Sequence, residues 1–197
     1  YPMPNIKDIL DKMDGSCYFS KMDMASAYWA IPLREVDKEK TAFSVPRGQY
    51  EMNVMAFGLC NSQATYQRLN DKVLSEEPNA ESYVDDVLAH TKAFEGHLIT
   101  LENVFIQFRS AGLQMRKEKC KFGYTEIDFV GHHITAEGYS LTDEHIKTVE
   151  QFPPPSGKDD LNRFIGLVNY YRDFIPKMAD IAEPLYKLLR QGAGWVW

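Results

Sequence analysis

The chain has no basic excess, which is the charge pattern that a phosphate-binding protein usually shows. Its 197 residues contain 22 Lys and Arg against 28 Asp and Glu, which gives a net charge of −6. Net charge alone therefore does not indicate a nucleic-acid partner, and it would mislead here. Basic residues do gather locally in "LREVDKEK" and "RKEKCK", although taken singly most of them are typical of a solvated face.

Cysteine and long apolar runs are also scarce. The three cysteines, Cys17, Cys60 and Cys120, are odd in number and widely spaced, so no disulfide framework is indicated. We find neither an apolar leader nor a run of about 18 apolar residues that could cross a bilayer. We therefore expect an intracellular protein with reduced thiols, no membrane partner and, with 44% hydrophobic residues, a real core.

Helix and strand signals alternate through the first two thirds of the chain. The predicted helices cover 4–15, 61–74 and 95–112, and the predicted strands lie within 17–23, 41–54, 81–90 and 121–134. The breaker "PRG" predicts a hairpin within 41–54, and "SYV" and "VLAH" predict another around "DD". The core-facing residues that we expect in the second and third helices are Ala64, Leu69 and Val73, then Leu98, Leu101, Val104, Phe105 and Phe108.

The last third of the chain has only helical signals. Thr142 is a plausible helix N-cap, Ser156 and Asp159 form a capping-box pattern, and Pro184 can open a last short helix. We predict an α+β fold in residues 1–134, with helices on one face of an antiparallel sheet, and a small helical domain in residues 135–197.

Asp85 and Asp86 are adjacent acids between runs that otherwise indicate buried strands. An uncompensated carboxylate is costly to remove from water, so this placement needs a reason. In the predicted sheet Asp23, at the end of a strand, can be their neighbour. A divalent cation such as Mg²⁺, which prefers oxygen ligands, would offset the charge, although "DD" in a turn is most often ordinary solvated turn chemistry.

The sequence resembles the reverse transcriptases at this point. The successive motifs are "KMDMASAYWAI", "FGLCNSQATYQ", "YVDD", "AGLQMRKEKCKF" and "FVGHHI". "TAF", "GLVNYYRDFIP" and "PLYKLL" are similar to the gypsy-type branch of LTR retrotransposons, and the resemblance spans the whole chain. It implies a polymerase palm with partial fingers in residues 1–134, then a helical thumb and the start of the connection toward a ribonuclease H domain in residues 135–197.

The resemblance also implies a role for each matched position. The catalytic and metal-binding set is Asp23, Asp85 and Asp86, with the Met24 carbonyl as a further ligand and Lys119 as the proton donor to pyrophosphate. The nucleotide-binding set is Ser26, Ala27, Tyr28, Phe57 and Gly58, in which Tyr28 would exclude a ribose 2′-hydroxyl. The primer-grip set is Phe129, Val130 and Gly131. From the residues alone, Tyr28, Phe57 and Phe129 could be plain core and Lys119 a solvated lysine.

Two positions depart from the family pattern. Ala56 and Gln63 stand where prolines are usual, and the loss of both could loosen the loop that shapes the nucleotide pocket. The chain also starts downstream of the family's N-terminal fingers. We therefore expect a piece of a larger Pol polyprotein product, or a truncated genomic relic.

The resemblance implies a nucleotidyltransferase that adds deoxynucleotides to a primer 3′ end with two Mg²⁺ ions, for which Mn²⁺ could substitute. Its partners would be an RNA or DNA template, a DNA or tRNA primer, deoxynucleoside triphosphates, and the fingers, ribonuclease H and integrase of the polyprotein. It would act in the cytoplasm, within a virus-like particle. The rivals are an inactive or domesticated nucleic-acid-binding fragment and another palm-type enzyme, such as a nucleotide cyclase.

Overall fold

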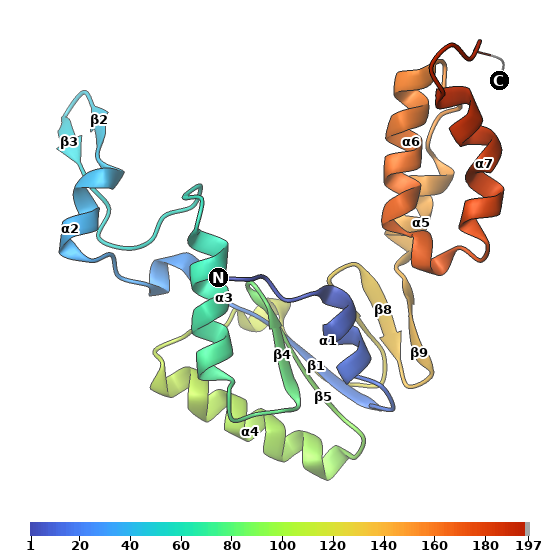
Figure 1. Ribbon diagram of the computed structural model, residues 1–197. Helices are drawn as coiled ribbons and strands as arrows, with labels where there is room; N and C mark the ends of the chain where they lie inside the picture. The colour runs from blue at the N-terminus through green and yellow to red at the C-terminus, as the bar shows by residue number, and fades with distance from the viewer. Residues whose placement is uncertain (196–197) are drawn as a thin grey trace. The chain divides into compact units, whose positions relative to one another are not determined.

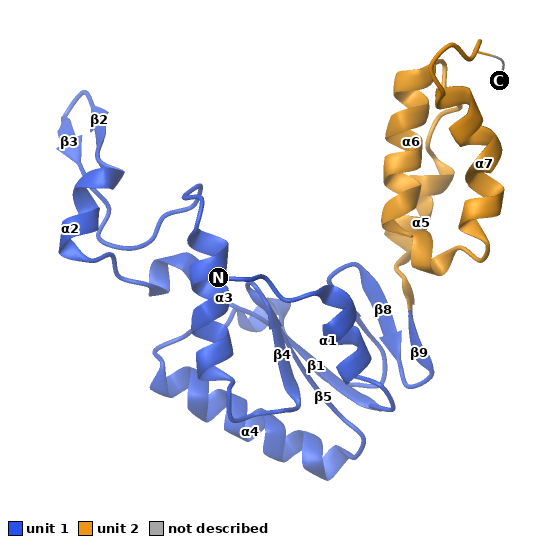
Figure 2. Ribbon diagram, viewed as in Figure 1, with its two compact units in different colours: residues 1–139 blue, residues 140–197 orange. Residues whose placement is uncertain are grey.

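The computed structural model describes residues 1–195, which fall into two compact units (Figure 2). The first, the sheet unit, covers 1–139, and the second, the helical unit, begins at Ser140. We predicted the division at residue 134. No strand was predicted at β9 (Gly138–Leu141), and the boundary between the two units falls within this strand.

A four-stranded antiparallel sheet lies at the centre of the sheet unit (Figure 1). Its spatial order is β4 (Ala80–Tyr83), β5 (Asp86–Thr91), β1 (Tyr18–Asp23) and β6 (Lys121–Tyr124). The expected hairpin around "DD" is therefore present, with β4 and β5 as its arms. The mixed α+β fold that the sequence predicts is confirmed.

The two faces of this sheet are covered differently, because neighbouring residues of a strand point to opposite sides. Met22 and Val87 pack with α3 (Ser62–Val73) and α4 (Phe94–Ser110) in one cluster of buried residues. Phe19 and Leu88 pack on the other side with α1 (Ile6–Lys12) and with the strands β7 (Ile127–Phe129) and β8 (His132–Thr135). We predicted helices on one face only, whereas α1 and the small sheet β7-β8-β9 cover the second face.

The predicted core-facing stripes of α3 and α4 are wrong in part. In α3 the fully buried side chains are Tyr66, Gln67 and Asn70, whereas Ala64, Leu69 and Val73 are only half-buried. In α4 Leu101, Val104 and Phe108 are buried as expected, but Leu98 is 53% exposed and Phe105 is 36% exposed. Their places in the core are taken by His97 and Thr100, which have polar partners there.

The segment between β1 and α3 carries short elements. They are the 3₁₀ turn Ala27–Ala30, α2 (Glu35–Lys38), the 3₁₀ turn Glu39–Thr41, β2 (Phe43–Val45) and β3 (Gly48–Tyr50). The strands β2 and β3 form the hairpin that "PRG" predicts, and all their residues are exposed. A further 3₁₀ turn, Lys117–Lys119, precedes β6.

The helical unit contains α5 (Asp143–Glu150), α6 (Lys158–Tyr170), the 3₁₀ turn Arg172–Phe174 and α7 (Met178–Leu189). Thr142 occupies the expected N-cap position, but Ser156 bonds Asp160 and not Asp159. Pro184 lies inside α7 and does not open it, because the helix already starts after the left-handed Lys177. Among residues 1–195 no helix is long and apolar enough to cross a membrane. Val196 and Trp197, the last two residues of the predicted helical domain, lie outside the described residues.

Candidate active site

The three predicted acids lie at one end of the central sheet. Asp23, the last residue of β1, is the register partner of Asp86, the first residue of β5. Next to this pair the backbone N–H of Met24 donates to the carbonyl of Asp85, at 3.0 Å. Asp23 and Asp86 face each other across neighbouring strands, so positions far apart in the sequence lie side by side.

Basic side chains surround these carboxylates. Lys21 Nζ lies 3.1 Å from Asp86 Oδ2. Arg116 Nε lies 3.4 Å from Asp23 Oδ1, and Lys119 Nζ lies 3.7 Å from Asp23 Oδ2. Lys119 was expected at the site, whereas Lys21 and Arg116 were not. Lys21 could have been found from its spacing, since residues two apart in a strand share a face.

The surroundings of Asp86 raise the cost of ionising its carboxyl group. Burial raises the pKa of Asp86, and the nearby charges of Asp85 and Asp23 raise it further, while Lys21 acts in the opposite direction. Like charges and desolvation both favour the protonated carboxyl. A bound cation would favour the ionised carboxylate and so offset both effects.

The donor chemistry of this site fits a hard divalent cation. Its ligands would be carboxylate and carbonyl oxygens, which Mg²⁺ prefers. Asp23 Oδ1 is buried and has no hydrogen-bond partner within residues 1–195, so it has capacity left for a ligand. Across the same residues no three His, Cys, Asp or Glu side chains converge into a ready metal cluster. Lys21, Arg116 and Lys119 engage the carboxylates in this arrangement.

The predicted nucleotide-binding residues gather beside the acids. The ring of Tyr28 lies 5.2 Å from that of Phe57 and 5.9 Å from that of Tyr66, both edge-on. Burial raises the pKa of Tyr28, and the charge of Asp85 raises it further, which places this acid within electrostatic reach of the phenol. The side chain of Gln63, one of the two departures from the family pattern, hydrogen-bonds Tyr28 and lowers that pKa.

The backbone near Tyr28 and Phe57 has a positive φ at two predicted positions. Ser26 has a φ of 52° and precedes the 3₁₀ turn that carries Ala27 and Tyr28. Gly58 has a φ of 85°, which suits glycine because it has no Cβ. Phe57, beside it, is 63% exposed although it contacts Tyr28, so it is not a plain core residue.

The predicted primer-grip residues lie at the end of β7, which is Phe129, and in the turn to β8, which is Val130 and Gly131. Phe129 is 1% exposed and belongs to the buried cluster on the α1 side of the sheet. Val130 and Gly131 both have positive φ, at 45° and 79°. Lys21 Nζ lies 5.9 Å from the centre of the Phe129 ring. The lysine that pairs with Asp86 is therefore also within cation–π distance of the last residue of β7.

Comparison with known proteins identifies the family. The family model described as reverse transcriptase (RNA-dependent DNA polymerase) matches residues 1–134. The chain belongs to the reverse transcriptase family. The resemblance noted in the sequence motifs is confirmed, and the nucleotide cyclase is set aside.

Relatives of this reverse transcriptase chain include the Tf2-3 and Tf2-7 transposon polyproteins of Schizosaccharomyces pombe (strain 972 / ATCC 24843). Each is 36% identical over 199 residues, which covers 100% of this chain and 15% of the relative. The chain therefore spans about 15% of the length of these relatives. They support the expectation of a retrotransposon polyprotein, and they do not favour an inactive relic.

Solved structures agree with this assignment. A foamy viral protease-reverse transcriptase in complex with double-stranded DNA is similar with a TM-score of 0.90 and 28% identity, covering 100% of this chain and 35% of that chain. A foamy viral protease-reverse transcriptase in complex with an RNA/DNA hybrid gives a TM-score of 0.83 and 28% identity, with 27% of that chain covered.

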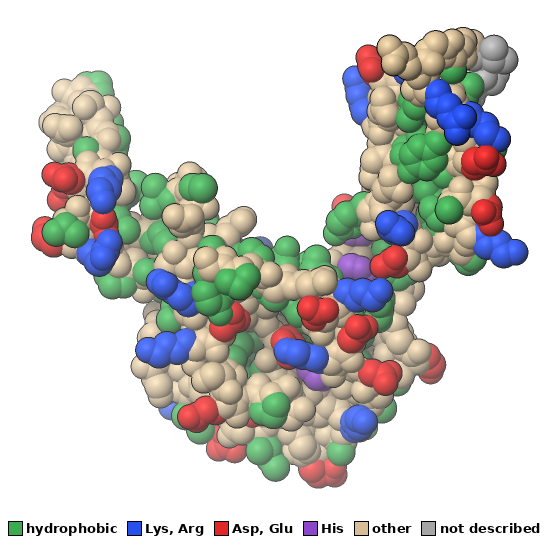
Figure 3. All heavy atoms as spheres, viewed as in Figure 1, with side chains coloured by type: hydrophobic (Ala, Val, Ile, Leu, Met, Phe, Trp, Pro, Cys, Tyr) green, Lys and Arg blue, Asp and Glu red, His purple; other side chains and the backbone are tan. Residues whose placement is uncertain are grey.

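The surface of the reverse transcriptase chain explains why net charge was uninformative. Figure 3 shows acidic and basic side chains interspersed over the visible face of the sheet unit, without a single-sign field. The cations that matter locally, Lys21, Arg116 and Lys119, lie against the acids themselves. The net charge is a sum over the chain and does not record where each charge lies, so it does not reveal these three cations.

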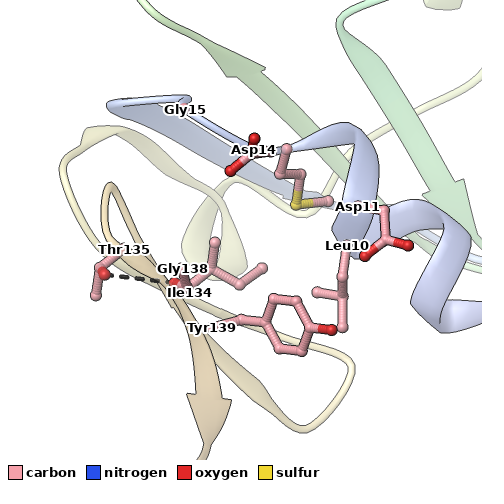
Figure 4. Close-up of a pocket in the computed structure, with 9 residues that line it drawn as sticks. Leu10, Asp11, Asp14, Gly15, Ile134, Thr135, Gly138 and Tyr139 are labelled. Carbon is pink, nitrogen blue, oxygen red and sulfur yellow. Dashed lines mark hydrogen bonds between the residues drawn. The ribbon is translucent and has the colours of Figure 1, made fainter.

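A separate cavity of about 300 Å³ lies between α1, with the turn that follows it, and the adjoining ends of β8 and β9 (Figure 4). Leu10, Ile134 and Tyr139 supply its apolar walls, with Asp11 and Asp14 among its other lining residues. None of the predicted site residues lines it. It is therefore not the nucleotide pocket.

Proposed function

We propose that this chain is the catalytic core of an RNA-directed DNA polymerase that adds deoxynucleotides to a primer 3′ end. The observation that carries the proposal is the pairing of Asp23 with Asp86, beside Asp85, in a member of the reverse transcriptase family. In the reaction the primer 3′-oxygen bonds to the α-phosphorus of the nucleotide. The bond between this phosphorus and the pyrophosphate oxygen breaks, and the proton of the hydroxyl passes to solvent.

The acids would hold two Mg²⁺ ions, or Mn²⁺ in their place. The ligands would be Asp23, Asp85 and Asp86, with the Met24 carbonyl as a further oxygen donor. When bound, such a pair supplies charge stabilisation at the attacking and leaving oxygens of an in-line displacement. Arg116 and the lysines would then release the carboxylates. Lys119, whose Nζ lies 3.7 Å from Asp23 Oδ2, would turn toward the leaving pyrophosphate and protonate it.

The nucleotide would lie against Tyr28 and Phe57. The ring of Tyr28 would sit beneath the sugar and exclude a ribose 2′-hydroxyl, which makes the product DNA. Phe57 would pack against sugar and base, and Gly58 allows close approach because the space where a Cβ would stand is open. The backbone N–H groups of Ser26 and Ala27 would meet the triphosphate.

Nucleic acid would pass over the turn between β7 and β8. Phe129, Val130 and Gly131 would steady the primer strand, which can be DNA or tRNA, on an RNA or DNA template. In this proposal residues 1–134 are the palm with part of the fingers, and residues 135–197 are the thumb with the start of the connection. The remaining fingers, ribonuclease H and integrase would come from the rest of the Pol polyprotein, in cytoplasmic virus-like particles.

Primer extension on poly(rA) with oligo(dT) tests the proposal. The comparison uses the chain alone, the chain with the family's N-terminal fingers restored, and the restored protein with Asp85→Asn. We expect little extension from the chain alone, rescue by the fingers, and loss of extension in Asp85→Asn with the fold intact by circular dichroism. Extension that is unaffected by Asp85→Asn would contradict the proposed site, and a folded, fingers-restored protein without activity would favour the inactive fragment.

A further inference from the structure

The residue before Asp85 has an unfavourable backbone conformation. Val84 has a φ of 55°, in the left-handed region. Tyr83 and Asp86 are register partners, so Val84 and Asp85 form a two-residue hairpin loop. Positive φ at the first position of such a loop is usual for Gly or Asn, and it is a rare outlier for a β-branched residue. The local sequence therefore does not favour the turn that presents Asp85.

Two side chains of α3 compensate for this conformation. The backbone N–H of Val84 donates to Gln67 Oε1 at 2.8 Å, and Asn70 Nδ2 donates to the carbonyl of Val84 at 2.6 Å. Residues three apart lie on the same face of a helix. Both polar backbone groups of Val84 are thus bound from one side by two amides that are 0% exposed.

Further bonds fix the orientation of Gln67. Its Nε2 donates to the carbonyl of Ser82 at 3.0 Å, to Ser82 Oγ at 2.8 Å and to Asp71 Oδ1 at 2.8 Å. Because Nε2 is committed to these acceptors, Oε1 must face the N–H of Val84. Gln67 therefore joins both the end of β4 and the first residue of the hairpin loop to the helix.

Asn70 has no comparable set of partners. Within residues 1–195 its Oδ1 is buried without a hydrogen bond, so the bond to Val84 is the one that accounts for a polar side chain at this position. A buried amide with an unused acceptor is costly, and an apolar side chain of similar size would pack there more cheaply. The cost is explained if Asn70 specifies the conformation of the turn.

We propose that Gln67 and Asn70 are positioning residues that hold Val84 in the left-handed conformation and thereby aim Asp85 at Asp23 and the incoming nucleotide. This inference rests on the proposed function. Neither residue touches the reacting atoms. Their effect is on the rate of the chemical step, because misplacement of a catalytic group by about 1 Å can cost about 100-fold in rate.

The test begins with Asn70→Asp and Asn70→Leu in the fingers-restored protein. Asp keeps the shape of the side chain but lacks the donor, and Leu removes both polar atoms. We expect kcat for nucleotide incorporation to fall by about 100-fold, with KM for the nucleotide within about twofold of the wild type. Lys72→Gln, an exposed change in the same helix, is the matched control and should leave both constants unchanged.

Rescue at position 84 separates positioning from a general loss of stability. In the Asn70→Leu background Val84→Gly removes the steric cost of positive φ. Val84→Ala removes the two γ-methyl groups but keeps the Cβ, and it therefore retains most of that cost. We expect the Gly double variant to recover kcat by about 10-fold or more over the Ala double variant. With Asn70 present, Gly and Ala should differ little. Equal kcat for the two double variants would overturn the proposal.

Amide hydrogen exchange provides a readout that does not depend on activity. The N–H of Val84 is bonded to Gln67 and should be protected in the wild type. Gln67→Met should accelerate its exchange by about 10-fold or more, while exchange in the middle of α4 stays unchanged. Wild-type exchange in this variant, or wild-type kcat in folded Asn70→Asp, would overturn the inference. If the wild type itself extends no primer while the N–H of Val84 is protected, the proposed function fails. The inference that Gln67 and Asn70 hold the backbone of Val84 then still stands.

Discussion

At the residue scale, two buried histidines make the stability of the sheet unit depend on pH. His90 is buried against Ser16, whose Oγ lies 3.0 Å from His90 Nδ1, and burial lowers the pKa of His90 from 6.5 to about 4. The charges of Lys12 and His97 act in the same direction. Burial also lowers the pKa of His97, which bonds Ser20 and Thr91. Both rings are therefore neutral in the folded protein at neutral pH.

We expect the free energy of unfolding to fall as the pH decreases from 6.5 toward 4. A base with a lowered pKa in the folded state stabilises the fold above its unfolded pKa, and this contribution is lost as the unfolded chain takes up the proton. For His90 the loss is about 3 kcal/mol. Urea unfolding of wild type and His90→Gln at several pH values measures it, with His133→Gln, a change at a half-buried histidine, as control. Equal pH dependence in wild type and His90→Gln would show that His90 does not contribute.

At the element scale, α4 shows how the position of a leucine determines its energetic contribution. Leu101 is 8% exposed and packs in the cluster between α4 and the sheet, whereas Leu98, one turn earlier, is 53% exposed. The same truncation at the two positions therefore removes very different amounts of buried apolar surface.

We expect Leu101→Ala to lower the free energy of unfolding by about 2–4 kcal/mol, because it leaves a cavity beside Val104 and Phe108. Leu98→Ala should change it by less than about 0.5 kcal/mol. Thermal or chemical denaturation of the two variants checks this pair. Similar losses at both positions would mean that Leu98 is buried and that the helix is rotated.

The elements could be predicted from the sequence better than their buried faces. Helical periodicity located α1, α3 and α4, and the strand signals on either side of "DD" located the hairpin there. The buried face of α3 was missed because Gln67 and Asn70 look like surface residues until the backbone that they bind is known. Lys21 and Arg116 were missed for a similar reason, since their partners are distant in sequence.

At the scale of the whole molecule, the described residues fall into two compact units that divide after residue 139, and the division into palm and thumb at residue 134 stays a prediction. The net charge of the chain did not reveal the cations at the site, because a sum over all residues does not show which charges lie together. Family motifs, each short, identified the reverse transcriptase because they occur in order along the chain. Composition cannot predict that Asp23 and Asp86 lie side by side, because this depends on the pairing of β1 with β5.

The central claim is that Asp23 and Asp85 contribute to one divalent-cation site, and Mn²⁺ binding followed by electron paramagnetic resonance tests it most directly. The measurement compares the fingers-restored wild type with Asp23→Asn and Asp85→Asn, which keep the shape of the side chain and remove its charge. We predict that the wild type binds Mn²⁺ and that each variant binds it at least about 10-fold more weakly. Wild-type affinity in both variants would contradict the account.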